Sequence, residues 1–148
     1  PEYIYIDSEK MKTHKDSEKT VKVIAGKFNS TEGPVNKHNV QPLYFDVVLN
    51  KDKIFNFNLP ETHNSFIYLI NGEIKVGEKK HEKITDSKLV LLTKGSKLKV
   101  ESLIKSNFLL ISGKPIGEKI ARGGPFVMNT KAEILEAIND YHNGTFVK

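Results

Sequence analysis

Histidine and glutamate are the side chains of this sequence that could ligate a metal or transfer a proton. The chain has five histidines. His63 lies two residues after Glu61 and just before an apolar run, and it is the one histidine that we consider as a metal ligand. A hydrogen-bonding role in the turn is the favoured interpretation of His63. The other four occur in charged or loop-like stretches or at a helix end, where exposed histidines are common: His14, His38, His81 and His142. We therefore predict no metal site, with His63 as the one open alternative.

The sequence gives little support for catalysis by a covalent nucleophile or by a catalytic triad. The sequence contains no cysteine, which excludes a thiolate nucleophile and a disulfide framework. Pairs of serine and histidine are too frequent to identify a nucleophile and its base, because the fold rather than the spacing brings such groups together. We predict no catalytic residue in this chain.

The charge pattern argues against specific binding of nucleic acid. The 148 residues carry a net charge of +5, almost all of it from lysine, and Arg122 is the only arginine. Readers of nucleic acid usually place several arginines, or basic residues beside stacking aromatics, at phosphates and bases. No apolar stretch approaches the roughly 20 residues of a membrane span, and no basic leader precedes an apolar run. We expect a soluble cytoplasmic protein that binds no specific nucleic acid and does not associate with a membrane.

Period-two alternation of apolar residues dominates the chain and predicts strands rather than helices. The segments with this pattern or with short apolar runs are 43–49, 55–59, 65–70, 73–76, 89–92, 98–100 and 108–111. Asn71-Gly72 between two of them predicts a β-hairpin. Thr13–Lys19 is predicted to be an exposed loop or short helix, and Asn29–Asn39 a long surface loop. An antiparallel sandwich or barrel follows from this spacing.

A single helix is predicted at the end of the chain, over residues 131–142. Thr130 and Glu133 have the spacing of a capping box, in which each side chain satisfies an amide of the other residue. An apolar stripe recurs at three- and four-residue intervals from Ile134 to Tyr141, and Gly144 follows where a left-handed stop is expected.

Two groups of motifs resemble a known family. The segment 112–118 followed by Gly-Pro-Phe-Val-Met-Asn-Thr at 124–130 resembles the terminal signature of the pirin family. Residues 65–77 and Thr93-Lys-Gly95 resemble the strand–turn–strand and the Pro-x-Gly motif of cupins. The resemblance implies an all-β cupin jelly roll with one C-terminal helix, a single domain over 1–148 that corresponds to the C-terminal half of a pirin.

The cupin motif also indicates where metal ligands would stand. Counting back from Gly72 places Ser65 at the glutamate position and, with the shorter spacing of the motif, Leu59 and Glu61 at the histidine positions. Counting on from Gly95 places Leu98 at the last ligand position. A leucine side chain has no lone pair to offer a metal. The resemblance therefore implies no cofactor in this chain, with iron or another divalent metal only in the N-terminal half.

The resemblance implies a structural and interactive role, as the half that packs against a metal-bearing N-terminal cupin domain. Two alternatives stay open: part of a metal-dependent quercetin 2,3-dioxygenase, and a transcriptional co-regulator that acts through protein contacts. Without the N-terminal half we expect self-association as a dimer. The pocket or interface candidates are Glu61, Phe66, Tyr68, Phe126 and Met128.

Overall fold

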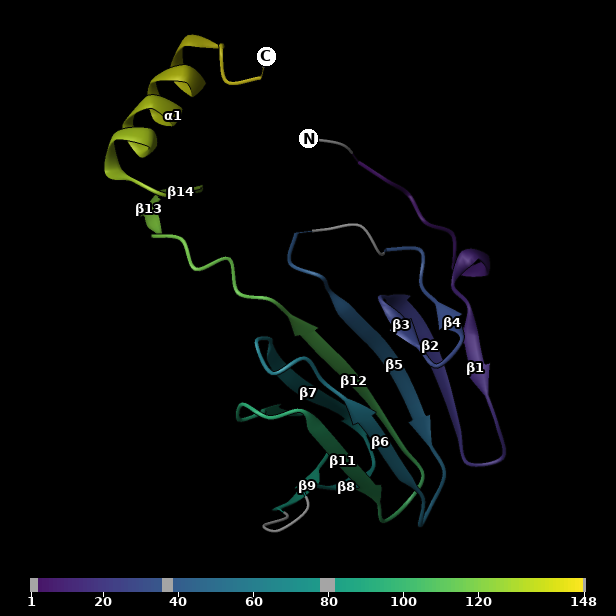
Figure 1. The fold of residues 1–148 in the computed structure, drawn as a ribbon. Helices are drawn as coiled ribbons and strands as arrows, with labels where there is room; N and C mark the ends of the chain where they lie inside the picture. The colour runs from purple at the N-terminus through teal and green to yellow at the C-terminus, as the bar shows by residue number, and fades with distance from the viewer. Residues whose placement is uncertain (1–2, 36–38, 78–81, 148) are drawn as a thin grey trace. The chain divides into compact units, whose positions relative to one another are not determined.

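The computed structural model describes residues 3–35, 39–77 and 82–147. Contacts along the backbone divide the chain into two compact units, residues 1–115 and 116–148. Figure 1 labels most elements of both units, and each unit is described by itself. The single domain expected over 1–148 stays a prediction.

The first unit contains a six-stranded antiparallel sheet with the strand order β1-β2-β5-β12-β7-β10. Its strands are β1 (Thr13–Lys15), β2 (Lys19–Ala25), β5 (Leu43–Leu49), β7 (Asn64–Asn71), β10 (Lys88–Leu91) and β12 (Ser106–Gly113). Every second residue of β5 and of β12 is buried, from Phe45 to Leu49 and from Ser106 to Ser112. This burial confirms the period-two pattern, because alternate side chains of a strand point to opposite faces.

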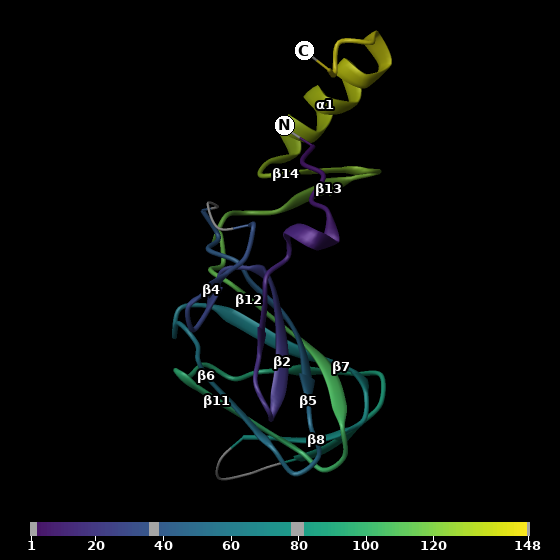
Figure 2. The same ribbon diagram turned by 90° about the vertical axis from the view of Figure 1, so that its right-hand side faces the viewer.

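A four-stranded antiparallel sheet with the order β6-β11-β8-β9 forms the second layer of this unit. Its strands are β6 (Ile54–Asn58), β8 (Glu73–Val76), β9 (Glu82–Thr85) and β11 (Lys97–Ser102). In Figure 2, β6, β8 and β11 run at an angle to β2 and β5. The inner faces of both sheets supply one apolar core, which includes Phe45, Phe55, Phe108, Ile67 and Val100. The predicted all-β sandwich is therefore confirmed.

The predicted hairpin at Asn71-Gly72 is wrong. Strand β7 pairs with β10 and β12 in the larger sheet, whereas β8 pairs with β9 and β11 in the smaller one. Gly72 adopts a φ of 106° and its amide donates to the carboxylate of Asp86, so the dipeptide turns the chain from one sheet into the other. The sequence predicted that strands lie on both sides of this dipeptide, but not the sheet that each strand joins.

The N-terminal region also differs from expectation. Thr13–Lys19 is neither a loop nor a helix throughout, because β1 occupies its first half and pairs with β2. Asp16 closes this turn: the amides of Glu18 and Lys19 donate to its carboxylate and lower the Asp16 pKa to about 2. A 3-10 helix, η1 (Ser8–Lys10), precedes β1, and the short strands β3 (Lys27–Phe28) and β4 (Thr31–Glu32) pair within or beside the predicted long loop. Part of that loop, 36–38, lies outside the described residues.

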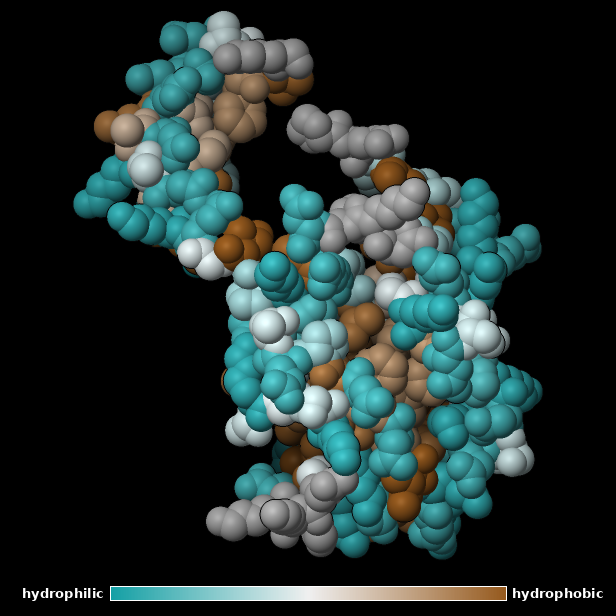
Figure 3. Space-filling model, viewed as in Figure 1, coloured by the Kyte–Doolittle hydropathy of each residue, from teal (hydrophilic) through white to brown (hydrophobic). Residues whose placement is uncertain are grey.

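The second unit consists of the hairpin β13 (Ala121–Gly123) and β14 (Phe126–Met128) and the helix α1 (Lys131–Asn143). Both halves of the predicted capping box are present between Thr130 and Glu133, and Gly144 ends the helix in the left-handed conformation. Helix α1 and β13 lie so close that a Cβ on Gly123 would collide with Ile134. Hydrophilic side chains cover one side of α1, and apolar ones appear on the other (Figure 3).

No helix in the described part of the chain is long and apolar enough to cross a membrane. The cytoplasmic location stays a prediction.

Candidate functional site at the mouth of the barrel

The positions expected for metal ligands gather at one end of the first unit, where β7 begins and β12 ends. We call this end the mouth and define it by Leu59, His63, Ser65, Leu98 and Ser112. Leu59 and Leu98 are buried members of the apolar core. Ser65 and Ser112 are cross-strand partners on β7 and β12. The mouth therefore combines an apolar side with a small polar cluster.

His63 is buried in this cluster, with only 5% of its surface exposed. Its Nδ1 lies 3.0 Å from Ser112 Oγ, and Ser65 Oγ donates to Ser112 Oγ at 2.8 Å. Within the preceding turn, the backbone amide of His63 donates to the carbonyl of Pro60. The imidazole is therefore bonded to Ser112 on the neighbouring strand β12, and not to the turn as the sequence suggested.

Lys94 links two loops at the mouth. One contains Thr93-Lys-Gly95, and the other leads into β7. The Lys94 ammonium donates to the carbonyl oxygen of His63 and to Asn64 Oδ1, both at 2.9 Å. Lys94 is the middle residue of Thr93-Lys-Gly95, so the loop that resembles the Pro-x-Gly motif is held to the start of β7. Sequence reasoning missed this role, although the position of Lys94 inside the motif was a signal that could have found it.

The surroundings of His63 favour its neutral form. Burial and the positive charges of Lys94 and Lys114 lower the pKa of His63 below its ordinary value of 6.5. With Ser65 donating to Ser112, the Ser112 hydroxyl can donate to Nδ1, and the neutral ring then carries its proton on Nε2. Among the buried side-chain nitrogens and oxygens of the described residues, His63 Nε2 is the one without a hydrogen-bond partner.

The residues at the mouth do not fit a transition-metal site. Leu59 and Leu98 offer no donor atoms, Glu61 is exposed on the preceding turn, and the Nδ1 of His63 already faces Ser112. In the part of the chain that the structure describes, no three histidine, aspartate or glutamate side chains are grouped as metal ligands. Nor is Ser112 a plausible nucleophile, because only 3% of its surface is exposed. Metal coordination by His63 alone has no supporting second ligand.

The remaining histidines are separate from this cluster. His14 is half-buried and lies 3.4 Å from the Asp16 carboxylate, and His142 is exposed in the last turn of α1. His38 and His81 lie outside the described residues.

Two of the predicted pocket or interface residues, Phe66 and Tyr68, point away from the core. Their neighbours Ile67 and Leu69 on β7 are buried, so the alternation turns Phe66 and Tyr68 to the outer side of the larger sheet. Tyr68 pairs with Leu89 and Leu109 on the flanking strands, and Phe66 pairs with Leu91 and Ile111. These six residues define the outer apolar face: Phe66, Tyr68, Leu89, Leu91, Leu109 and Ile111.

Part of the outer apolar face is strongly exposed. Leu89 and Leu91 keep 57% and 76% of their surface accessible, and Tyr68 keeps 37%. Apolar side chains that are neighbours on a sheet form a continuous patch, and large patches of this kind mark interaction surfaces. The position of Phe66 and Tyr68 is therefore typical of an interface rather than of an internal cavity.

Phe126 and Met128 lie in the second unit, where both are half-buried. The ring of Phe126 lies 6.1 Å from that of Tyr141 and 5.2 Å from that of Phe146. These rings line a hollow of about 600 Å³ beside the turn at Gly124. Phe126 and Met128 thus belong to the second unit, whereas His63 belongs to the first.

Comparison with known proteins agrees with this architecture. A family model described as the pirin C-terminal cupin domain matches residues 44–147. A pirin-like protein of Caulobacter vibrioides is 33% identical over 133 residues, which cover 89% of this chain and 47% of that protein. Human pirin is 33% identical over 146 residues, covering 97% of this chain and 50% of pirin.

A crystal structure of quercetin 2,3-dioxygenase from Acinetobacter baumannii matches with a TM-score of 0.83 and 28% sequence identity. The match covers 95% of this chain and 49% of that one. This chain spans about half the length of the relatives it matches. The cupin jelly roll expected from the sequence is confirmed.

Proposed function

Because the chain belongs to the family of pirin C-terminal cupin domains, we propose that its role is structural: it packs against a second, metal-bearing cupin domain. The observation that carries the proposal is the outer apolar face, whose leucines on β10 are exposed. The relatives are about twice as long as this chain, which supplies a reason for a further domain to cover that face.

The composition of the mouth supports assigning the metal to the second domain. Leucines stand at two of the expected ligand positions, and the buried His63 is bonded to Ser112. In this proposal the barrel of the present chain holds no metal, and iron or another divalent metal belongs to its partner.

A second candidate function is a share in a metal-dependent quercetin 2,3-dioxygenase. The name and fold of the Acinetobacter baumannii structure favour it. The chain alone should then consume no more oxygen with quercetin than a buffer control, whereas its complex with a metal-bearing cupin should exceed that control. A role in transcriptional co-regulation stays a prediction.

Mixing the chain with the N-terminal half of the Caulobacter pirin-like protein tests the structural proposal. We expect a one-to-one complex by light scattering coupled to size exclusion, and a dimer of the chain when the other half is absent. The double substitution Tyr68→Ser with Leu89→Ser should abolish both, because these cross-strand neighbours lie within the outer apolar face.

Ile104→Ser is the matched control, since Ile104 is an exposed apolar residue outside that face. Ile104→Ser should bind like the unmodified chain. A complex that survives the double substitution, or a chain that binds no cupin half and stays monomeric, would contradict the proposal.

A further inference from the structure

A cavity of about 400 Å³ opens at the mouth between the smaller sheet and strand β10. Its wall is aliphatic and comes from both sheets and the loops beside them: Leu59, Val76, Ile84, Val90, Leu92 and Leu98. Three of these residues are buried in the core, and the other three are half-buried and packed against it. Cavities of roughly 300–1,000 Å³ with mainly apolar walls are typical sites for small molecules.

Strand β10 separates this cavity from the outer apolar face. Val90 is half-buried and lines the cavity, whereas its neighbour Leu89 belongs to the outer apolar face and keeps 57% of its surface exposed. Successive side chains of a strand point to opposite faces of the sheet. Leu91, at the end of the strand, borders both. Substitutions at positions 89 and 90 therefore change different surfaces.

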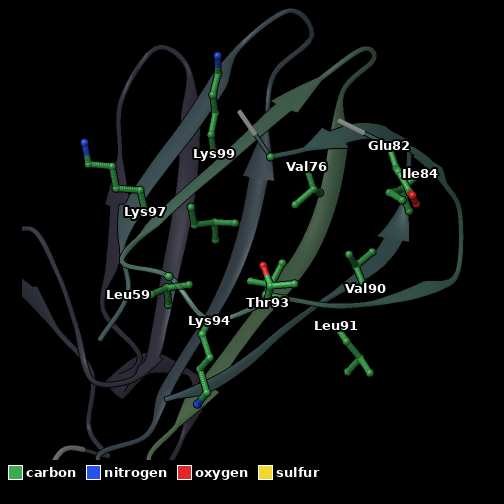
Figure 4. A pocket seen from close by; sticks show the side chains of 14 residues that line it. Leu59, Val76, Glu82, Ile84, Val90, Leu91, Thr93, Lys94, Lys97 and Lys99 are labelled. Carbon is green, nitrogen blue, oxygen red and sulfur yellow. The ribbon is translucent and has the colours of Figure 1, made fainter. Parts of the chain in front are cut away.

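Two of the lysines beside the cavity lie on the outer face of the smaller sheet. Lys97 and Lys99 alternate along β11 with the buried Leu98 and Val100, so their side chains point away from the core. Figure 4 shows both lysines extending away from the aliphatic wall. Neither ammonium group faces the cavity.

The other charged residues leave the aliphatic wall without charge. The ammonium of Lys94 donates to the carbonyl oxygen of His63 at 2.9 Å. Glu82 is the one acidic residue that lines the cavity, and it is exposed at the start of β9. A charged group of a ligand loses its hydration on burial unless it finds a partner. The wall offers no such partner, so it favours an uncharged molecule.

Thr93 supplies a neutral polar group at the opening. In Figure 4 its side chain lies among those of Leu59, Val76 and Val90, which surround the central space. In the part of the chain that the structure describes, no hydrogen bond engages the Thr93 hydroxyl. A hydroxyl can both donate and accept, so it suits an alcohol or a carbonyl group equally.

We propose that this cavity binds a neutral aliphatic molecule that carries one hydroxyl or carbonyl group. The aliphatic part would displace water from the leucine, isoleucine and valine wall, and its binding free energy would follow the apolar area removed from water. The polar group would lie near Thr93 at the opening. Neither a metal nor a second cupin takes part, so the inference goes beyond the structural role proposed above.

Alcohols of increasing length and two charged analogues test the proposal: 1-hexanol, 1-heptanol, 1-octanol, octanoate and octylammonium. Each is titrated into the full chain, and binding is followed by NMR of the isoleucine, leucine and valine methyl groups. We expect saturable shifts and about fourfold tighter binding for each added methylene of the alcohol. Octanoate and octylammonium should each bind at least about tenfold more weakly than 1-octanol.

The methyl groups that shift locate the bound alcohol. Those of Val76, Val90 and Leu98, which line the cavity, should shift with 1-octanol. Those of Leu89 on the outer apolar face and of Leu135 on α1 should not, although both residues are exposed.

Val90→Phe should fill the cavity and weaken 1-octanol binding at least about tenfold. Leu89→Phe is the matched control, because it adds the same ring at the neighbouring position on the opposite face of β10. It should bind 1-octanol like the unmodified chain. If Val90→Phe loses the methyl spectrum of the folded chain, Thr93→Phe replaces it, since Thr93 is exposed beside the same space. The same loss of affinity is expected.

Four results would overturn the proposal: a charged analogue that binds as tightly as 1-octanol, an affinity that ignores chain length, shifts confined to the outer apolar face, or no saturable binding up to the solubility limit. Unchanged affinity in a folded Val90→Phe or Thr93→Phe variant would do the same. Association with a second cupin is measured separately, so either proposal can fail while the other holds.

Discussion

Where β12 begins, buried serines are bonded to backbone atoms, whereas where β12 ends, a buried histidine keeps one ring nitrogen without a partner among the described residues. We call the first end the base and define it by Gly72, Ser102 and Ser106. The Ser106 hydroxyl lies 2.8 Å from the carbonyl oxygen of Ile104 and accepts from the amide of Glu73 at 3.1 Å. Ser102 makes equivalent bonds to the carbonyls of Asn50 and Lys53.

The two ends differ in how completely their buried polar groups are hydrogen-bonded. At the base, hydroxyls replace missing backbone partners at the points where strands change sheets, and the polar groups are satisfied. At the mouth, Nε2 of the buried His63 has no hydrogen-bond partner among the described residues. Departures from full hydrogen bonding are expected where a protein binds or reacts rather than where it is only held together.

The largest effect is expected at Gly72 of the base. A Cβ at Gly72 would lie 2.7 Å from Ser106 Cα, and the φ of 106° is one that other residues rarely adopt. Gly72→Ala should therefore lower the free energy of unfolding by about 3 kcal/mol or more, measured by urea denaturation. Gly95→Ala at the mouth is the control: its Cβ would meet no atom within 4 Å, and the change should stay within about 0.5 kcal/mol.

A second experiment compares the polar groups of the two ends. Ser106→Ala leaves the amide of Glu73 without this acceptor and should cost about 2 kcal/mol of unfolding free energy. His63→Leu combined with Ser112→Ala removes both partners of the mouth bond and an unpaired nitrogen, so it should change stability by less than about 1 kcal/mol. The same denaturation curves report both values. If the double variant loses more free energy of unfolding than Ser106→Ala does, the proposed difference between the base and the mouth is wrong.

Lowering the pH should reduce the free energy of unfolding through protonation of His63 at the mouth. Folding lowers the His63 pKa, so below its ordinary value of 6.5 the unfolded chain binds a proton that the folded chain resists. Stability from this group is therefore complete above that value and is lost as the pH falls, by at most about 1.4 kcal/mol at pH 5.5. Urea midpoints at pH 7.5 and 5.5 measure the loss, and His63→Leu with Ser112→Ala should remove this part of it. An identical pH dependence in the two proteins would refute the assignment.

The smallest effect is expected for Lys94→Gln. Its amide can still donate to the His63 carbonyl, so the free energy of unfolding should fall by less than about 1 kcal/mol. Loss of the positive charge should raise the His63 pKa toward its ordinary value, which NMR titration of the imidazole can follow. Lys105→Gln, at an exposed position outside the mouth, should leave that pKa in place.

Local features of the sequence predicted the helix and the strands β5, β6, β7, β8, β10, β11 and β12, but not β2 or β9. Thr130, Glu133 and Gly144 specify both ends of α1 through bonds that span a few residues, and these bonds are present. Alternation predicted β5, β6 and β12 because burial of one sheet face imposes a period of two on the residues themselves. The motifs at 112–118 and 124–130, together with the cupin-like segments at 65–77 and 93–95, likewise identified the family.

Only the tertiary structure decided which strands became neighbours and what the polar residues touch. Asn71-Gly72 is compatible with a hairpin, and its turn between sheets depends on Asp86, which lies 14 residues away. His63 meets Ser112 across 49 residues, and Lys94 reaches His63 across 31. Such contacts form when two sheets close over a shared core, so their partners are set by packing between distant segments. For the same reason, an outward Tyr68 and an inward Ile67 become distinguishable as interface and core once the sheets are paired.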